Sequence, residues 1–181
     1  MGVDRNLRNI ESDKEFESRI RPQQLRNFAG QDKIVANLKI FIKAALMRGD
    51  SLDHVLLHGP PGLGKTTLAN IIANTTKGNF VKLNAVSAGV ADVKRVQEEA
   101  EQNLRMYGQK TYLLLDECHR FNKTQQDSLL PSIEDGTIIF IGSTTENPYA
   151  SMTPAIVSRC RVFELKRLSE KDIEIALNRA I

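Results

Sequence analysis

The side chains best suited to chemistry lie in the segment 59–66, which reads Gly-Pro-Pro-Gly-Leu-Gly-Lys-Thr. This spacing satisfies the pattern G-x-x-x-x-G-K-[ST], in which glycines let successive backbone N–H groups point at one anion at the start of a helix. Lys65 would reach the β- and γ-phosphates of a nucleotide, and Thr66 would offer its hydroxyl to Mg²⁺. The alternative is a plain Gly-Pro-rich turn ahead of a helix. The predicted nucleotide contacts are Gly59, Pro60, Pro61, Gly62, Leu63, Gly64, Lys65, Thr66 and Thr67.

A pair of acidic residues follows an apolar run at 112–115. A nucleotide bound with Mg²⁺ needs one carboxylate to orient the metal and a second to activate the attacking water. We assign the metal to Asp116 and the role of base to Glu117. The alternative is an acidic pair that only complements the start of a helix. His119 follows shortly after, and we expect it to pack or to form local hydrogen bonds, because no other metal ligand stands at a suitable spacing.

Strands and helices must bring these segments together. Short apolar runs predict five strands, at 54–58, 80–83, 112–116, 137–143 and 161–165. Helical periodicity and end signals predict helices from Asp32 to a stop at Gly49, over 65–76, over 92–107, from an Asn122–Gln125 capping box toward Leu130, and from Ser169 onward. Leu46 and Leu104 are assigned to the inward faces of their helices. The alternation predicts an α/β, three-layer fold with a five-stranded parallel sheet and helices on both faces.

Composition bounds the class of protein. With 181 residues, the chain fits one α/β domain, and its net charge of +3 permits contact with nucleic acid without arguing for it. No apolar stretch approaches the length of a membrane span, so we expect no membrane partner. Two cysteines, Cys118 and Cys160, fit a reducing cytoplasm better than a disulfide framework.

With those residues in place, the chain resembles AAA+ ATPases. Residues 16–74, including Phe28-Ala29-Gly30-Gln31 and the segment 59–72, look like the N-terminal half of RuvB, the Holliday-junction branch-migration motor. From Phe80 onward the chain looks like the RarA/MgsA group of replication-recombination ATPases, most diagnostically at Thr145-Glu146-Asn147-Pro148. The change from one likeness to the other falls near 74–78, which raises the hypothesis of a chimera, natural or engineered.

The resemblance implies further site residues. Arg21, Pro22, Phe28, Ala29, Gly30 and Ile34 would form the adenine side of the pocket, although they could equally be ordinary packing at the start of a helix. Thr145 resembles the residue that senses the γ-phosphate or the attacking water. Arg159 resembles an arginine finger that reaches the site of a neighbouring subunit, with a surface cation at a helix end as the alternative.

The same resemblance implies domains and partners. It divides the chain into a lead-in and adenine-side segment at 1–27, a nucleotide-binding subdomain of the P-loop NTPase type (the AAA+ large subdomain) at 28–168, and the first helix of a lid at 169–181. The lid would be incomplete, so we expect this chain to bind ATP or ADP weakly and to hydrolyse ATP slowly or not at all. A homo-oligomer and DNA are the partners of such proteins. A role with RuvA is doubtful, because 135–138 leaves no room for the hairpin that engages it.

Three functions remain open at this point. The leading one is an ATPase core linked to DNA recombination, repair or replication-fork maintenance, acting with Mg²⁺ in the cytoplasm. The second is a clamp-loader-like switch whose nucleotide state controls the binding of a partner. The third is an engineered or truncated P-loop domain with little or no turnover. The tetrapeptide Asp116-Glu117-Cys118-His119 also resembles a helicase box, but the A-x-x-G-x-G-K-T loop of those helicases is missing.

Overall fold

A computed structural model describes residues 21–180, so most of the predicted lead-in lies outside the described residues. Five strands form one sheet in the order β2-β3-β4-β1-β5, and every pair is parallel. The strands are β1 (His54–His58), β2 (Asn79–Asn84), β3 (Thr111–Asp116), β4 (Ile138–Thr144) and β5 (Cys160–Glu164). The predicted α/β class and the five-stranded parallel sheet are thus confirmed.

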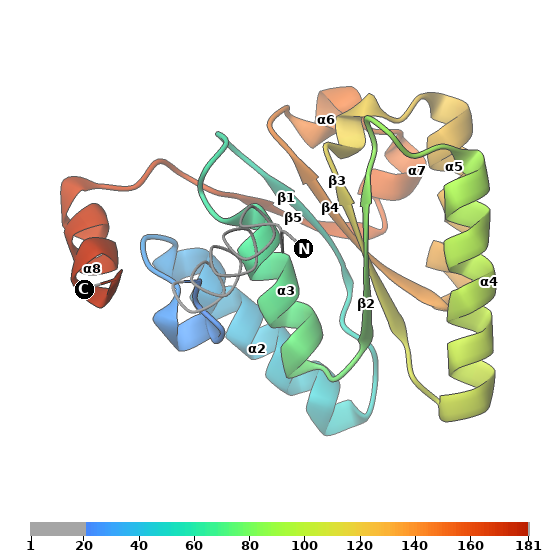
Figure 1. Cartoon of the computed structure of the whole chain (residues 1–181), viewed down its shortest axis with the longest axis horizontal. Helices are drawn as coiled ribbons and strands as arrows, with labels where there is room; N and C mark the ends of the chain where they lie inside the picture. Colours follow the sequence, from blue (N-terminus) through green and yellow to red (C-terminus); the bar gives the residue numbers. More distant parts are fainter. Residues whose placement is uncertain (1–20, 181) are drawn as a thin grey trace, which may run out of the picture.

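Helices cover both faces of this sheet (Figure 1). On one face lie α2 (Asp32–Arg48) and α3 (Lys65–Thr75), and on the other lie α4 (Val90–Tyr107) and α5 (Lys123–Asp135). Each face has its own apolar core, and β3 up to Leu115 and all of β4 are buried because both faces of these strands are covered. The sheet is therefore the middle of three layers, as predicted.

Local signals explain where the helices begin and end. Asn122 accepts a hydrogen bond from the Gln125 backbone N–H, and the Gln125 side chain accepts one from the Asn122 N–H, both at 2.9 Å. This is the predicted capping box, and α5 starts there. Helices α2 and α4 both end at a glycine in the left-handed conformation, Gly49 and Gly108.

Several details differ from the prediction. Leu46 is 56% exposed and Leu104 is 36% exposed, so neither belongs to the core. Each lies at the margin of its helix's apolar stripe, where periodicity alone does not show how far the partner layer extends. Helix α5 runs on to Asp135, and the short helices α6 (Pro148–Ser151) and α7 (Pro154–Val157) were not expected, since four residues are too few to show a period. The short 3₁₀ turns η1 (Leu25–Asn27) and η2 (Cys118–Arg120) were also missed.

The segment after β5 leads away from the sheet to α8 (Glu170–Ala180), which stands apart from the three layers (Figure 1). It is held first by Gln31, whose buried side-chain amide donates to the Lys166 carbonyl at 2.6 Å and accepts from the Lys166 N–H at 3.1 Å. Leu168 then packs against Gly30, where a Cβ would come within 2.1 Å of the Leu168 side chain. Arg179 of α8 donates to the Asn27 carbonyl. Within 21–180, no helix has the length and apolar character to cross a membrane.

Candidate nucleotide-binding site

The loop between β1 and α3 curls over the carboxyl end of the sheet. Gly59, at φ +145°, begins it and donates its N–H to the Thr144 carbonyl at 3.2 Å. A Cβ on Gly59 would lie 2.3 Å from the Leu165 carbonyl oxygen, so this position has no room for a side chain. Gly64, at φ +87°, precedes the first residue of α3, and the Leu68 N–H donates to its carbonyl at 2.9 Å. The N-terminus of α3 therefore faces the loop, as a phosphate site requires.

Lys65 is folded back onto this loop. Its Nζ donates to the Gly59 carbonyl at 2.9 Å and to the Pro60 carbonyl at 2.8 Å. Burial lowers the pKa of Lys65, and the nearby Glu117 and Asp116 carboxylates act in the opposite direction. A partly desolvated ammonium enclosed by carbonyl oxygens is well placed to exchange these contacts for phosphate oxygens.

Asp116 ends β3 in a network that fixes its carboxylate. Ser143 Oγ donates to Oδ1 at 2.5 Å, and the Glu117 N–H donates to the same oxygen at 3.1 Å. Lys82 Nζ lies 3.9 Å from Oδ2. Neither Ser143 nor Lys82 was predicted, because their approach depends on which strands flank β3. The alternation of side chains along β2 does place Lys82 on the same face of the sheet as Asp116 of β3. The contact between Lys82 and Asp116 could therefore have been predicted once the β2–β3 pairing was known.

Glu117 adopts the left-handed conformation, with φ +53°. This conformation is uncommon for a residue other than glycine or asparagine, and costs on the order of 1 kcal/mol. It turns the chain sharply after β3, and the Glu117 side chain is 36% exposed. Strain of this kind is found most often at functional sites.

One cavity of about 450 Å³ collects the predicted phosphate and metal residues. Its lining consists of Arg21, Pro61, Gly62, Gly64, Lys65, Thr66, Thr67, Lys82, Asp116, Glu117 and Thr145. Thr145, predicted only from resemblance, therefore lies in the same cavity as Lys65 and Glu117. The predicted metal residues Thr66 and Asp116 also meet there.

A second cavity of about 550 Å³ adjoins the first and shares Arg21, Gly62, Gly64 and Thr67 with it. Pro22, Phe28 and Ala29, three of the residues predicted on the adenine side, line it together with Leu63 of the phosphate loop. Leu168, Ala176 and Arg179 complete this wall and were missed, because no spacing in the sequence shows that α8 returns to η1. A neighbouring pair of cavities, one polar and one largely apolar, suits the phosphates and the base of one nucleotide.

Five predicted residues lie outside the lining of both cavities. Ile34 is in the core of the α2 face and, with Gly30, lines a different cavity. Pro60 and Gly59 act through their carbonyls on Lys65. Arg159 is 39% exposed, and its guanidinium donates to Glu134 Oε1 at 2.8 Å and to the Ala155 carbonyl at 2.7 Å. Within this chain it therefore holds α7 against α5.

The parallel sheet, the glycine-rich loop at the start of α3 and the acidic pair after β3 define a P-loop ATPase of the AAA+ type. A family model described as the Holliday junction DNA helicase RuvB P-loop domain matches residues 20–154, and the chain belongs to this family. The solved RuvB branch migration motor of Thermotoga maritima is 32% identical and superposes with a TM-score of 0.77, covering 89% of this chain and 53% of that one.

Curated relatives show the second likeness. The replication-associated recombination protein A of Escherichia coli K12 is 45% identical over 173 residues, which is 94% of this chain and 38% of that protein. The ATPase WRNIP1 of Dictyostelium discoideum is 44% identical over 162 residues, 90% of this chain and 18% of that protein. The chain thus spans well under half the length of these relatives. Because one relative matches both sides of the expected join at 74–78, the chimera hypothesis gains no support.

Proposed function

We propose that this chain is the ATP-binding core of an AAA+ ATPase that serves DNA recombination, repair or replication-fork maintenance, and that it hydrolyses ATP with Mg²⁺ as part of a homo-oligomer. The observation that carries the proposal is the single cavity lined by Lys65, Thr66, Asp116, Glu117 and Thr145. The relatives named for recombination support the biological setting. The two unpaired thiols are consistent with a cytoplasmic location.

The donor set suits Mg²⁺, which binds through few protein oxygens and completes its shell with water and phosphate. No cluster of three His, Cys, Asp or Glu side chains able to hold a metal occurs among residues 21–180, and Mg²⁺ in a P-loop site does not need one. Thr66 and Asp116 are the residues that would hold the ion, which when bound neutralises charge on the phosphates. Ser143 orients the Asp116 carboxylate for that task.

The remaining chemistry belongs to the side chains. Lys65 binds phosphate oxygens, and Thr145 hydrogen-bonds the γ-phosphate or the attacking water. Glu117 accepts a proton as the water oxygen forms its bond to the γ-phosphorus, while the bond to the bridging oxygen breaks and ADP leaves with the electron pair. For Arg159 to act on a neighbouring subunit's nucleotide, its guanidinium must first leave Glu134.

Nucleotide binding and hydrolysis are tested separately with three variants. At one hundred times its Kd, ATP-Mg²⁺ should stabilise the chain by about 2.7 kcal/mol, which raises Tm by about 5–10 °C. Lys65→Ala should lose most of this shift, and the exposed-surface control Lys94→Ala on α4 should keep it. Glu117→Gln should keep the shift but lower hydrolysis by about 10²–10⁴-fold. A Tm indifferent to ATP-Mg²⁺ in the unmodified chain would refute nucleotide binding.

The clamp-loader-like switch is the competing function, and its distinguishing feature is what stimulates hydrolysis. Stimulation by DNA alone favours the remodelling role, whereas stimulation that requires a sliding clamp or a single-strand binding protein favours the switch. A RuvA partner stays doubtful for this chain, because only residues 136–137 separate α5 from β4 and no hairpin is inserted there.

A further inference from the structure

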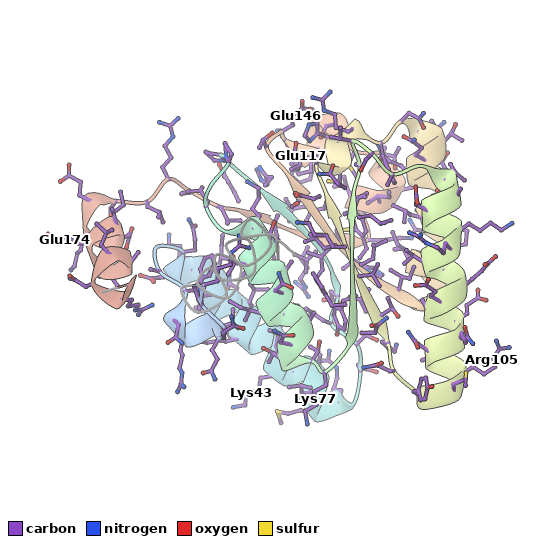
Figure 2. All side chains as sticks on the ribbon, viewed as in Figure 1. Lys43, Lys77, Arg105, Glu117, Glu146 and Glu174 are labelled. Carbon is purple, nitrogen blue, oxygen red and sulfur yellow. The ribbon has the colours of Figure 1, made fainter. Side chains whose placement is uncertain are left out.

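His119 lies between the β4 end of the site and the carboxylate of Glu117. Its side chain is only 8% exposed, and Nδ1 is 2.7 Å from Thr144 Oγ1. On the other side of the ring, Nε2 is 3.5 Å from Glu117 Oε2 and 3.8 Å from Glu146 Oε1. Figure 2 shows Glu117 and Glu146 at the same edge of the sheet. The His119 ring therefore lies between Thr144 of β4 and Glu117, the expected base.

The hydrogen bonds of Thr144 favour one tautomer of the His119 ring. Thr144 Oγ1 accepts the Glu146 backbone N–H at 3.0 Å, and its own hydroxyl proton needs an acceptor. His119 Nδ1 lies at hydrogen-bond distance, and the tautomer in which Nδ1 accepts this proton while Nε2 carries the ring proton satisfies both groups. That Nε2–H faces two carboxylates, Glu117 and Glu146, which are acceptors only. One directional chain thus runs from the Glu146 N–H through Thr144 and His119 toward Glu117.

Thr144 connects this chain to both halves of the nucleotide site. Its carbonyl accepts the N–H of Gly59, the first residue of the phosphate loop. The next residue in sequence is Thr145, which lines the phosphate cavity. Thr144 itself is fully buried and paired in register with His58 of β1, so its hydroxyl has a fixed position. A side chain that is hydrogen-bonded to Thr144 consequently has a fixed position relative to the phosphate loop.

We propose that His119 is a positioning residue for hydrolysis: it sets the orientation of the Glu117 carboxylate relative to the γ-phosphate, using Thr144 as its fixed support. The proposal rests on the ATP hydrolysis proposed above. Glu117 needs such a support, because its backbone is in the left-handed conformation and its side chain is 36% exposed. Glu146, on the exposed β4–α6 turn, is the second acceptor and competes with Glu117 for the same Nε2–H.

The alternative role of His119 is packing alone, and conservative variants separate the two. His119→Gln places an amide near the position of Nε2, whereas His119→Asn reaches only the position of Nδ1. In single-turnover hydrolysis, His119→Ala and His119→Asn should slow the chemical step by about ten- to a hundredfold, since misplacing a catalytic group by about 1 Å has effects of that size. Their Kd for ATP should stay within about twofold, and His119→Gln should recover most of the rate.

Three results would overturn the proposal: an unchanged rate in His119→Ala, a His119→Gln no faster than His119→Asn, or a loss of ATP affinity that accounts for the whole defect. A histidine that only packs would produce the second and third of these results, an equal rate in His119→Gln and His119→Asn and a defect explained by weaker ATP binding. Glu117→Gln, which removes the base itself, supplies the lower limit of the rate in the same assay.

The tautomer offers a second measurement that does not depend on turnover. Nitrogen NMR of the full chain should show His119 as the Nε2–H tautomer, and Glu117→Gln should move its Nε2 signal more than the matched Glu146→Gln does. An Nδ1–H tautomer, or a larger response to Glu146→Gln, refutes the positioning role. If the unmodified chain binds ATP but never hydrolyses it, the proposed hydrolysis fails, and the NMR experiment still decides the placement of His119 against Glu117.

Discussion

Gly59→Ala tests the close contact between the phosphate loop and the chain that follows β5. The new Cβ would lie 2.3 Å from the Leu165 carbonyl oxygen, which is backbone and cannot rotate away. In addition, φ +145° is a conformation that alanine disfavours by about 1–3 kcal/mol. Relieving the overlap pushes Leu165 from β1 and weakens its 2.7 Å hydrogen bond to the His58 carbonyl, worth about 1 kcal/mol. We expect a total loss near 3 kcal/mol, or about 6–12 °C in Tm.

Gly49→Ala is the matched control. Gly49 also has a positive φ, +70°, but a Cβ there meets nothing within 4 Å. It should cost only the left-handed strain, about 1–2 kcal/mol, and leave ATP binding unchanged. Thermal unfolding without ATP-Mg²⁺ measures the loss of stability in each variant, and the rise in Tm on adding ATP-Mg²⁺ measures nucleotide binding. Gly59→Ala should also lose most of this rise. Equal Tm losses in the two variants would refute the reasoning, because the contact with Leu165 would then contribute nothing.

Two further predictions concern titration. Burial lowers the pKa of His54, whose ring bridges the Ile133 carbonyl and the Phe140 N–H, and it lowers the pKa of His58. The unfolded chain therefore takes up protons before the folded chain does as pH falls below about 6.5, and the free energy of unfolding should decrease from pH 7.5 to 5.5. In His54→Asn this decrease should be shallower. An unchanged pH dependence in that variant would contradict the assignment to His54. Burial also raises the pKa of Cys118 to about 12, so an aromatic disulfide reagent at pH 8 should modify it only on unfolding, and rapid modification of the folded chain would contradict its buried position.

The parts predicted from sequence are those fixed by local rules. The loop at 59–66 has the spacing of a known phosphate-binding motif, and the Asn122–Gln125 capping box is formed by residues three apart. Asp116 and Glu117 could be placed in the site because parallel strands deliver their carboxyl ends to one edge of the sheet.

The parts that were missed depend on contacts between residues distant in the chain. Ser143 meets Asp116 across 27 positions only because β4 lies beside β3, and sequence periodicity does not give the order of strands. The partner of Arg159, Glu134, likewise depends on how α7 packs against α5. Ile34 was placed by resemblance at the adenine side, but the helical phase of α2 directs it into the core.

The double hydrogen bond between Gln31 and Lys166 limits where this molecule can bend. Together with the Gly59–Leu165 contact and the packing of Leu168 on Gly30, it fastens the segment 165–168 to both the phosphate loop and the start of α2. A hinge between the sheet and α8 therefore has to lie beyond Leu168. Upstream of that point the segment is held as a rigid arm, so a shift of the phosphate loop would be carried as far as Leu168, while α8 has its own anchor through Arg179 on the Asn27 carbonyl.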